Sequence, residues 1–172
     1  MQEAPDPAAQ APSFFIRAAS PSDVADIHAL IIALAEYERA RDRVVATEAD
    51  LMRALFDDGA CVHAYVAMQG ERCVGFALYF TSYSTWTGRH GLWLEDLFVL
   101  PECRGEGIGK ALLATLAQLA VARGYTRLEW NVLDWNEPAL RFYRSLQAEA
   151  LSEWTVHRLD GDSLHARARS KP

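Results

Sequence analysis

The sequence has few of the features that mark secreted, metal-binding or membrane-spanning proteins. It contains 3 cysteines, Cys61, Cys73 and Cys103, and none lies in a CxxC pair or a Cys/His cluster with metal spacing. Neither a disulfide framework nor a metal site is therefore expected. No apolar run approaches the ~20 residues that a membrane helix needs. Residues 1–13, MQEAPDPAAQAPS, lack the basic start and apolar stretch of a signal peptide. We expect a cytoplasmic protein with reduced thiols and no membrane partner.

Basic character is also scarce. The formal net charge is -6 at pH 7 and no basic stripe runs along the chain, which argues against nucleic acid as a partner and favours small cationic molecules. The 172 residues are 51% hydrophobic, enough for one domain with a full core. Residues 1–13 are rich in Ala, Pro and Gln without periodicity, so we expect a disordered tail followed by a single domain over 14–172.

The apolar periodicity predicts an α/β chain with a mixed sheet. Capping boxes at Ser20/Asp23 and at Thr47/Asp50 mark two helix starts. Residues 84–91 form a polar loop that holds Trp86. The expected elements are a strand at 14–18, helices from 20 to about 39 and 47 to 57, strands at 62–67, 73–83 and 92–99, a helix at 107–122, a strand at 128–133, a helix at 137–146 and a last strand at 154–159.

The stretch from Glu95 to Lys110, EDLFVLPECRGEGIGK, predicts a strand, a glycine-rich turn and a helix start. Backbone N–H groups at a helix N-terminus have no partner inside the helix, and glycines let a ligand approach them closely. The turn therefore suits an anion such as a pyrophosphate, and Arg104 adds a forked cation. On the turn alone, the glycines could also serve only to cap the helix and pack it on the sheet.

Two acids, Glu95 and Asp96, stand side by side in this otherwise apolar strand. Adjacent strand residues face opposite sides of a sheet unless a bulge re-aims them. An acid with a buried side needs a partner or a function. Glu95 is thus either a catalytic base or a structural acid paired with a basic core neighbour. The segment with Glu36 and Tyr37, AEYERARD, is either a solvated helix end or part of a site.

The flanking motifs favour a cofactor site at the glycine-rich turn. Arg104, Gly107 and Gly109 give Arg-x-x-Gly-x-Gly after a strand ending Val-x-Pro, and VLDWNEPALRFYRSL places Asn136 and Tyr143 seven apart. Both patterns resemble the GNAT (GCN5-related) N-acetyltransferases. The segments IIALAEYE, YSTWTGRHGLWLEDLFVLPECRGEGIG and NVLDWNEPALRFY look like the spermidine/spermine acetyltransferase family, especially its thialysine-acetylating branch, over about residues 14–160.

The resemblance implies a fold, a co-substrate and an assembly. The fold is the GNAT fold, a single α/β domain with a mixed, mostly antiparallel sheet flanked by helices. The co-substrate is acetyl-CoA, and the family's enzymes are homodimers with the site near the subunit interface. The implied cofactor-binding residues are Phe98 and Val99 on the strand, Arg104, Gly105, Glu106, Gly107, Ile108, Gly109 and Lys110 in the turn, and Asn136 and Tyr143 after the fifth strand.

The resemblance also assigns catalytic and acceptor-binding roles. Tyr143 would protonate the departing coenzyme A sulfur, and Asn136 would cap its helix, contact the pantetheine amide, or do both. Glu95 and Asp96 would face the amine, with Glu95 as the base, directly or through a water. The further candidates for the acceptor site are Trp86, Glu36 and Tyr37.

Three positions depart from the family pattern. Ser84 stands where polyamine-specific members carry an aspartate, Gln147 replaces the glycine that usually follows the FYxxL helix, and the end, LSEWTVHRL, is shortened. The expected reaction is acetyl transfer from acetyl-CoA, by direct attack, to a primary amine of a small cation. Such a cation is a diamine, a polyamine or a thialysine-like amino acid. The alternatives are a non-catalytic acyl-CoA-binding module and a protein N-terminal or lysine acetyltransferase.

Overall fold

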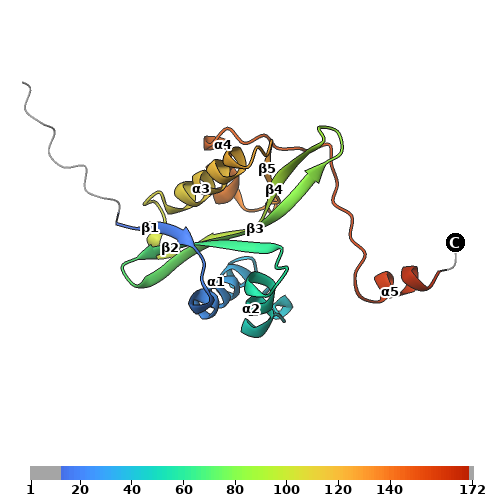
Figure 1. Cartoon of the computed structure of the whole chain (residues 1–172), viewed down its shortest axis with the longest axis horizontal. Coiled ribbons are helices and arrows are strands. Elements are labelled where there is room, and N and C mark those ends of the chain that lie inside the picture. The colour runs from blue at the N-terminus through green and yellow to red at the C-terminus, as the bar shows by residue number, and fades with distance from the viewer. Residues whose placement is uncertain (1–12, 171–172) are drawn as a thin grey trace, which may run out of the picture. The chain divides into compact units, whose positions relative to one another are not determined.

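The computed structural model describes residues 13–170 (Figure 1). The expected disordered tail, apart from Ser13, lies outside the described residues. The chain divides into two compact units, one ending at Asn131 and the other beginning at Val132, and each is described by itself. The domain bounds 14–172 stay a prediction. None of the helices in the described part of the chain is long and apolar enough to cross a membrane.

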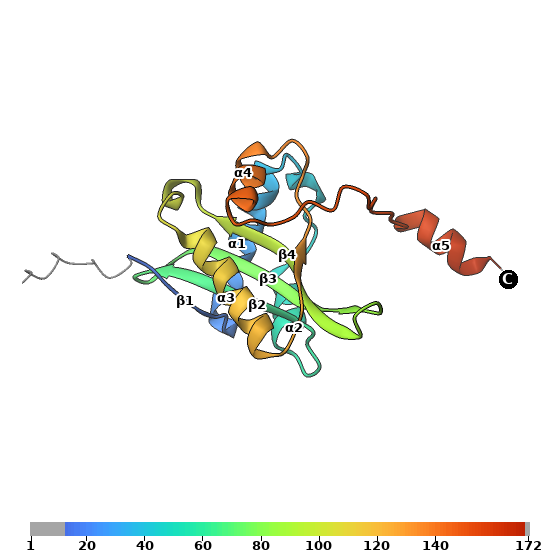
Figure 2. The same cartoon turned by 90° about the horizontal axis from the view of Figure 1, so that it is seen from above.

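The first unit is a five-stranded mixed sheet with helices on both faces, as the resemblance implies. The strands run in the order β1-β2-β3-β4-β5, and all neighbours are antiparallel except β4 and β5. Helices α1 and α2 cover one face and α3 covers the other (Figure 1 and Figure 2). The elements are β1 (Phe15–Ala18), α1 (Val24–Tyr37), α2 (Glu48–Phe56), β2 (Val62–Gln69), β3 (Arg72–Ser84), β4 (Arg89–Val99), α3 (Ile108–Ala122) and β5 (Leu128–Trp130).

Most of the predicted elements are found within a few residues, and the bounds around the β3–β4 turn and at the end of β5 are among those that differ. Strand β3 runs on to Ser84 and β4 already begins at Arg89, so the expected loop 84–91 is a short hairpin turn. Strand β5 ends at Trp130, three residues before the predicted end at Leu133. The middle strand of the sheet is β3, with β1 and β2 on one side and β4 and β5 on the other.

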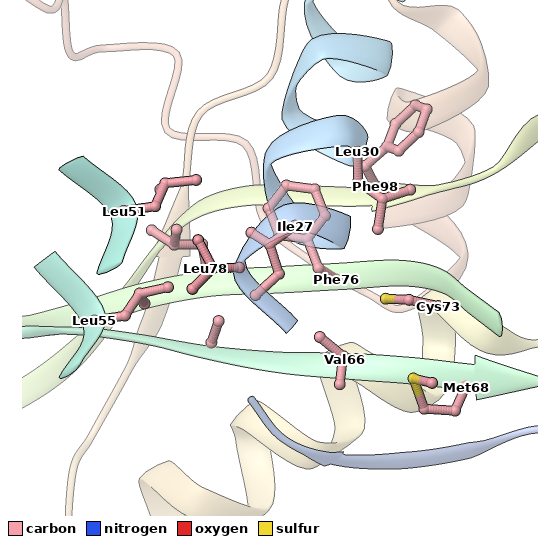
Figure 3. Close-up of a cluster of buried hydrophobic side chains, with 12 residues drawn as sticks. Ile27, Leu30, Leu51, Leu55, Val66, Met68, Cys73, Phe76, Leu78 and Phe98 are labelled. Atoms are coloured by element: carbon pink, nitrogen blue, oxygen red, sulfur yellow. The ribbon is translucent and has the colours of Figure 1, made fainter. Parts of the chain in front are cut away.

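The main core lies between the sheet and the first two helices. Ile27 of α1 is fully buried against Phe76 of β3, and Phe98 of β4 joins the same cluster (Figure 3). Leu51 and Leu55 bring in α2. On the opposite face α3 buries its apolar stripe, Ile108, Leu112 and Leu116. Strand β4 is thus packed on both faces, which fixes the strand that carries the candidate site.

Both predicted capping boxes are present. The Asp23 carboxylate accepts from the Ser20 backbone N–H at 2.7 Å, and Asp50 accepts from the Thr47 N–H at 2.8 Å. Asp23 also receives two hydrogen bonds from the Arg17 guanidinium, at 2.6 and 2.7 Å. These bonds hold the pKa of the buried Asp23 carboxyl well below its usual range. The pair ties β1 to the start of α1.

The second unit holds α4 (Glu137–Ser145) and α5 (Gly161–Arg169). The strand predicted at 154–159 is wrong: the described chain has no strand after β5. Trp154, Val156 and Leu159 are 63%, 70% and 57% exposed. An alternating apolar pattern produces a strand only where a neighbouring strand pairs with its backbone groups. Helix α5 was not predicted, although GDSLHARAR contains several good helix formers.

Replacing Asp23 by Asn should destabilise the fold by about 2 kcal/mol at pH 7, because Arg17 loses its charged partner at a buried site. The wild-type pair contributes fully above the unfolded carboxyl pKa near ~4, and its contribution fades as pH falls below that value. Urea denaturation at pH 7 and pH 3 measures both effects. Asp58→Asn, an exposed change at the end of α2, is the control. An equal effect of the two variants at pH 7 would contradict the prediction.

Candidate active site

The adjacent acids of β4 lie at a β-bulge. In the pairing of β3 with β4, Leu78 lies opposite Asp96 and Tyr79 lies opposite Leu94, with a register shift between Leu78 and Tyr79. Glu95 is therefore the extra residue of β4. A bulge bends the strand and re-aims the side chains beside it.

The bulge places both acids on the α1/α2 face. Leu78 and Phe80 are two residues apart on β3, so their side chains lie on the same face of the sheet, the face on which Leu78 packs in the core. Their partners on β4, Asp96 and Trp93, therefore lie on that face too. Glu95 reaches the same face, because Trp93 Nε1 donates to Glu95 Oε2 at 3.1 Å. In a regular strand one of the two acids would have pointed at α3.

A third acid meets this pair from helix α1. Burial, followed by the negative charges of Glu95 and Glu38, together raise the pKa of Asp96 to about 6. Glu38 is the C-cap residue of α1, and burial raises its pKa too. We call Glu38, Glu95 and Asp96 the acidic cluster. Such a cluster can hold a cation and accept a proton from it.

No basic side chain balances Glu95. Among residues 13–170, none of the arginines or lysines forms an ion pair with the Glu95 carboxylate. A structural acid paired with a basic core neighbour is therefore not what the structure contains.

The glycine-rich turn opens toward solvent at the start of α3. Gly105 and Gly107 have φ of +85° and +87°, and a Cβ added at either would meet nothing within 4 Å. Gly107 is the N-cap of α3, so the N–H groups of the first helical turn, including those of Gly109 and Lys110, have no partner inside the helix. The turn thus offers free N–H groups and the positive end of a helix dipole to an anion.

Arg104 connects this turn to the end of α1. Its Nε donates to the Val99 carbonyl oxygen at 3.0 Å, and its guanidinium carbon lies 4.9 Å from the Tyr37 ring centre and 5.4 Å from that of Phe98. Glu106 accepts from Gln69 Nε2 at 2.7 Å. The structure therefore brings Tyr37 to the cofactor turn, where sequence reasoning had placed it with the acceptor.

The outer edge of β4 loses its partner strand where the acids begin. Strand β5 pairs with β4 only from Leu92 to Leu94. Beyond Leu94, no strand of residues 13–170 pairs with that edge of β4, along the stretch that includes Phe98 and Val99. An extended ligand can hydrogen-bond to such an unpaired edge as an added strand does.

Two sequence candidates are not brought to the acidic cluster. Trp86 sits in the turn between β3 and β4 and is 86% exposed, and the strand from Arg89 to Glu95 spans roughly 20 Å. Ser84 closes this turn, because its Oγ accepts from the Thr87 N–H at 3.3 Å. Glu36 is also exposed, with Arg41 4.0 Å away.

The structure selects Glu38 where sequence reasoning had selected Glu36. Two residues apart on a helix, these side chains point in directions about 200° apart. Glu38 closes α1 on the side of Asp96, while Glu36 faces solvent. The sequence contains a signal for this choice. The apolar stripe Ile27, Leu30, Ile31 and Leu34 continues at helical spacing to position 38, so Glu38 lies on the buried side of α1.

Asn136 and Tyr143 belong to the second unit. Asn136 is buried, and its Oδ1 accepts from the Ala139 N–H at 3.3 Å to cap α4. Tyr143 is half-buried on α4, with its ring centre 5.2 Å from that of Phe142. Gln147, where the resembled family has glycine, adopts φ +61°. This left-handed conformation, which favours glycine, explains the family's residue and costs glutamine roughly 1 kcal/mol.

The first unit thus combines an open helix start, an unpaired strand edge and a re-aimed acid pair. Residues 27–147 match the family model described as Acetyltransferase (GNAT) family, and the chain belongs to that family.

Two characterised relatives align over most of the chain. It is 38% identical to thialysine N-epsilon-acetyltransferase of Bos taurus, over 89% of this chain and 96% of that protein. It is 30% identical to L-ornithine N5-acetyltransferase NATA1 of Arabidopsis thaliana, over 88% of this chain and 86% of that protein. Among solved structures, an integron cassette protein of V. cholerae superposes with a TM-score of 0.78 at 28% identity, covering 92% of this chain and 99% of the other.

Replacing Asp96 by Asn should stabilise the free protein by about 2 kcal/mol at pH 7.5. Because the folded-state pKa of Asp96 is raised to about 6, the folded protein binds a proton more tightly than the unfolded chain, and wild-type stability falls as pH rises from about 4 to about 6. The variant should lack this fall and match the wild type near pH 4. Urea denaturation across this range measures it, with Asp58→Asn as the control. A destabilised Asp96→Asn protein at pH 7.5 would contradict the assignment.

Proposed function

We propose that this acetyltransferase moves the acetyl group of acetyl-CoA to a primary amine of a small cationic acceptor by direct attack. The observation that carries the proposal is the bulge at Glu95, which turns two adjacent acids to one face beside the unpaired edge of β4. The aligned relatives, named for thialysine and ornithine, act on small amino acids with a side-chain amine. The candidate acceptors are a thialysine-like amino acid, a diamine or a polyamine.

The acidic cluster suits an acceptor that arrives protonated. An alkyl amine has a pKa of about 10.4, so at neutral pH less than about one in a thousand is free to attack. Asp96 and Glu38 are proposed to hold the ammonium group. Glu95, which has no basic partner among residues 13–170, is proposed to take its proton, directly or through a water. The deprotonated amine then attacks the acetyl carbonyl carbon.

The cofactor contacts are proposed to be made largely by main-chain groups. The N–H groups from Arg104 to Lys110 (Arg104, Gly105, Glu106, Gly107, Ile108, Gly109 and Lys110) would bind the pyrophosphate, and the side chain of Arg104 would add charge. The backbone of Phe98 and Val99 would pair with the pantetheine arm, and the Asn136 amide would contact it. A β4 N–H aimed at the thioester carbonyl would stabilise the developing oxyanion.

Tyr143 is proposed as the proton donor to the departing sulfur and as a further contact to the cofactor. An ordinary phenol has a pKa near ~10 and a thiol near ~8.5, so a complete transfer is uphill by about 2 kcal/mol. The proton therefore moves as the carbon–sulfur bond breaks, rather than to a free thiol already formed.

The remaining acceptor candidates have different places in this proposal. Tyr37 supports the cofactor end through Arg104. Glu36 is a surface residue, and Glu38 is proposed in its place. Trp86, on the exposed hairpin tip, is proposed to reach the acceptor site of a second subunit.

We further propose a cytoplasmic homodimer. The second unit exposes large apolar side chains within a short stretch, at Leu151, Trp154, Val156, Leu159 and Leu164, and such surface is commonly covered by a partner. Light scattering on the purified protein would test this; a monomer at micromolar concentration would contradict it.

The direct test is an amine panel with purified protein, following thiol release from acetyl-CoA. We expect thialysine, lysine-like amino acids and short diamines to react faster than spermidine and spermine, because Ser84 leaves the hairpin without the aspartate that would bind a distant ammonium. Rates should rise with pH as the amine and the base lose their protons. Glu95→Gln should lower the rate at pH 7.5 by about 10- to 1000-fold.

Spermine outperforming every short amine would contradict the selectivity. Wild-type activity of Glu95→Gln at neutral pH would remove Glu95 as the base. No thiol release with any amine, despite thermal stabilisation by acetyl-CoA, would favour a non-catalytic acyl-CoA-binding module.

Tyr143→Phe keeps the packing on Phe142 and removes the phenol. We expect kcat to fall by about 10- to 1000-fold with little change in the KM for acetyl-CoA, as for loss of a positioned proton donor. Phe142→Leu, a change on the same helix that leaves the phenol, is the control. Unchanged kcat in Tyr143→Phe would mean that water protonates the thiolate.

A further inference from the structure

Trp93 has no part in the mechanism above, yet it touches the proposed base. Its indole Nε1 donates to Glu95 Oε2 at 3.1 Å. Its ring lies 6.4 Å from that of Phe80 on the neighbouring strand, and the residue is half-buried. Glu95 is itself exposed. The donor is thus held by packing, while the acceptor stands in solvent on a bulge.

An exposed glutamate on a bulge needs something to hold it. Its side chain has three rotatable bonds, and fixing them costs conformational entropy. The negative charges of Glu95 and Asp96 repel each other, so repulsion and hydration both favour a Glu95 carboxylate turned outward. Among residues 13–170 no ion pair pulls it back. The Trp93 N–H is the group in place to oppose this repulsion.

We propose that Trp93 is a positioning residue, whose indole N–H holds the Glu95 carboxylate on the α1/α2 face of β4, where the amine is proposed to bind. The inference rests on the proposed function, in which Glu95 takes the proton of the amine. A base acts only within hydrogen-bond reach of that proton, and a misplacement of about 1 Å can cost two orders of magnitude in rate. Indole N–H is a donor only and cannot compete for the amine's proton.

The geometry of the bulge explains why the donor comes from Trp93. Residues two apart on a strand share a face and stand within reach of a large side chain. Glu95 is the extra residue opposite β3, so it has no cross-strand neighbour of its own to pack against. Trp93 does have one, in Phe80. Trp93, which is fixed by its cross-strand neighbour, therefore holds Glu95, which has none.

The test is a cycle of three variants, Trp93→Phe, Glu95→Gln and both together, assayed with the best amine of the panel. Trp93→Phe keeps an aromatic ring and removes the N–H. We expect kcat to fall about 5- to 30-fold, with the KM for acetyl-CoA and the melting temperature nearly unchanged. In the Glu95→Gln background the same change should alter kcat less than about 2-fold, because the group that Trp93 holds is no longer a base.

A matched control separates the N–H from the ring. Phe80→Leu loosens the packing around the indole and leaves the donor in place, so kcat should fall less than about 3-fold. An equal fall in Phe80→Leu and Trp93→Phe would mean that ring packing carries the effect and would overturn the proposal. So would an unchanged kcat in Trp93→Phe, or the same fold-change with and without Glu95.

The contact itself can be tested without turnover. The indole ¹H–¹⁵N resonance that disappears in Trp93→Phe belongs to Trp93, and it should shift in Glu95→Leu, which removes the acceptor. A resonance unmoved by Glu95→Leu would overturn the inference even in an active enzyme. An inactive wild type would instead contradict the proposed function, while this measurement would still decide whether Trp93 holds Glu95.

Discussion

The bulge in β4 is the constraint on which the rest of the site depends. A strand has a period of two, so a single extra residue exchanges the faces of every side chain that follows it. With Glu95 as that residue, Asp96 and Phe98 both face α1, and Phe98 can join the core while Asp96 meets Glu38. The pairing of β4 with β5 also stops at Leu94, one residue before the bulge. The bulge thus accounts for the acidic cluster, and the unpaired strand edge begins beside it.

The acidic cluster costs stability, and the proposed function gives this cost a role. Burying Asp96 beside two like charges raises its pKa to about 6, which means that the empty site disfavours the ionised form. A bound ammonium would relieve the repulsion among these carboxylates. The repulsion in the free protein therefore increases the affinity for a cation. Arg17 and Asp23 show the opposite case. There a buried acid has its own cation at 2.6 Å and stabilises the fold.

Arg104 has contacts that join the cofactor turn to helix α1. Its guanidinium lies against Tyr37 and Phe98 while its Nε donates to the Val99 carbonyl. The end of α1, which carries Glu38, is therefore packed on the same residue that borders the anion turn. The proposed acceptor and cofactor ends of the first unit share one set of supporting side chains.

The sequence by itself determined the elements of the first unit, their order, both capping boxes and the open turn at Gly105 and Gly107. These follow from local physics, namely apolar period, side-chain capping and the freedom of glycine at positive φ. The sequence did not determine which of Glu36 and Glu38 faces Asp96, the side on which Glu95 lies, or that residues 154–159 form no strand. The packing of α1 beside β4, the register of β4 on β3 and the presence of a pairing partner decide these features, and all three arise only when distant segments pack together.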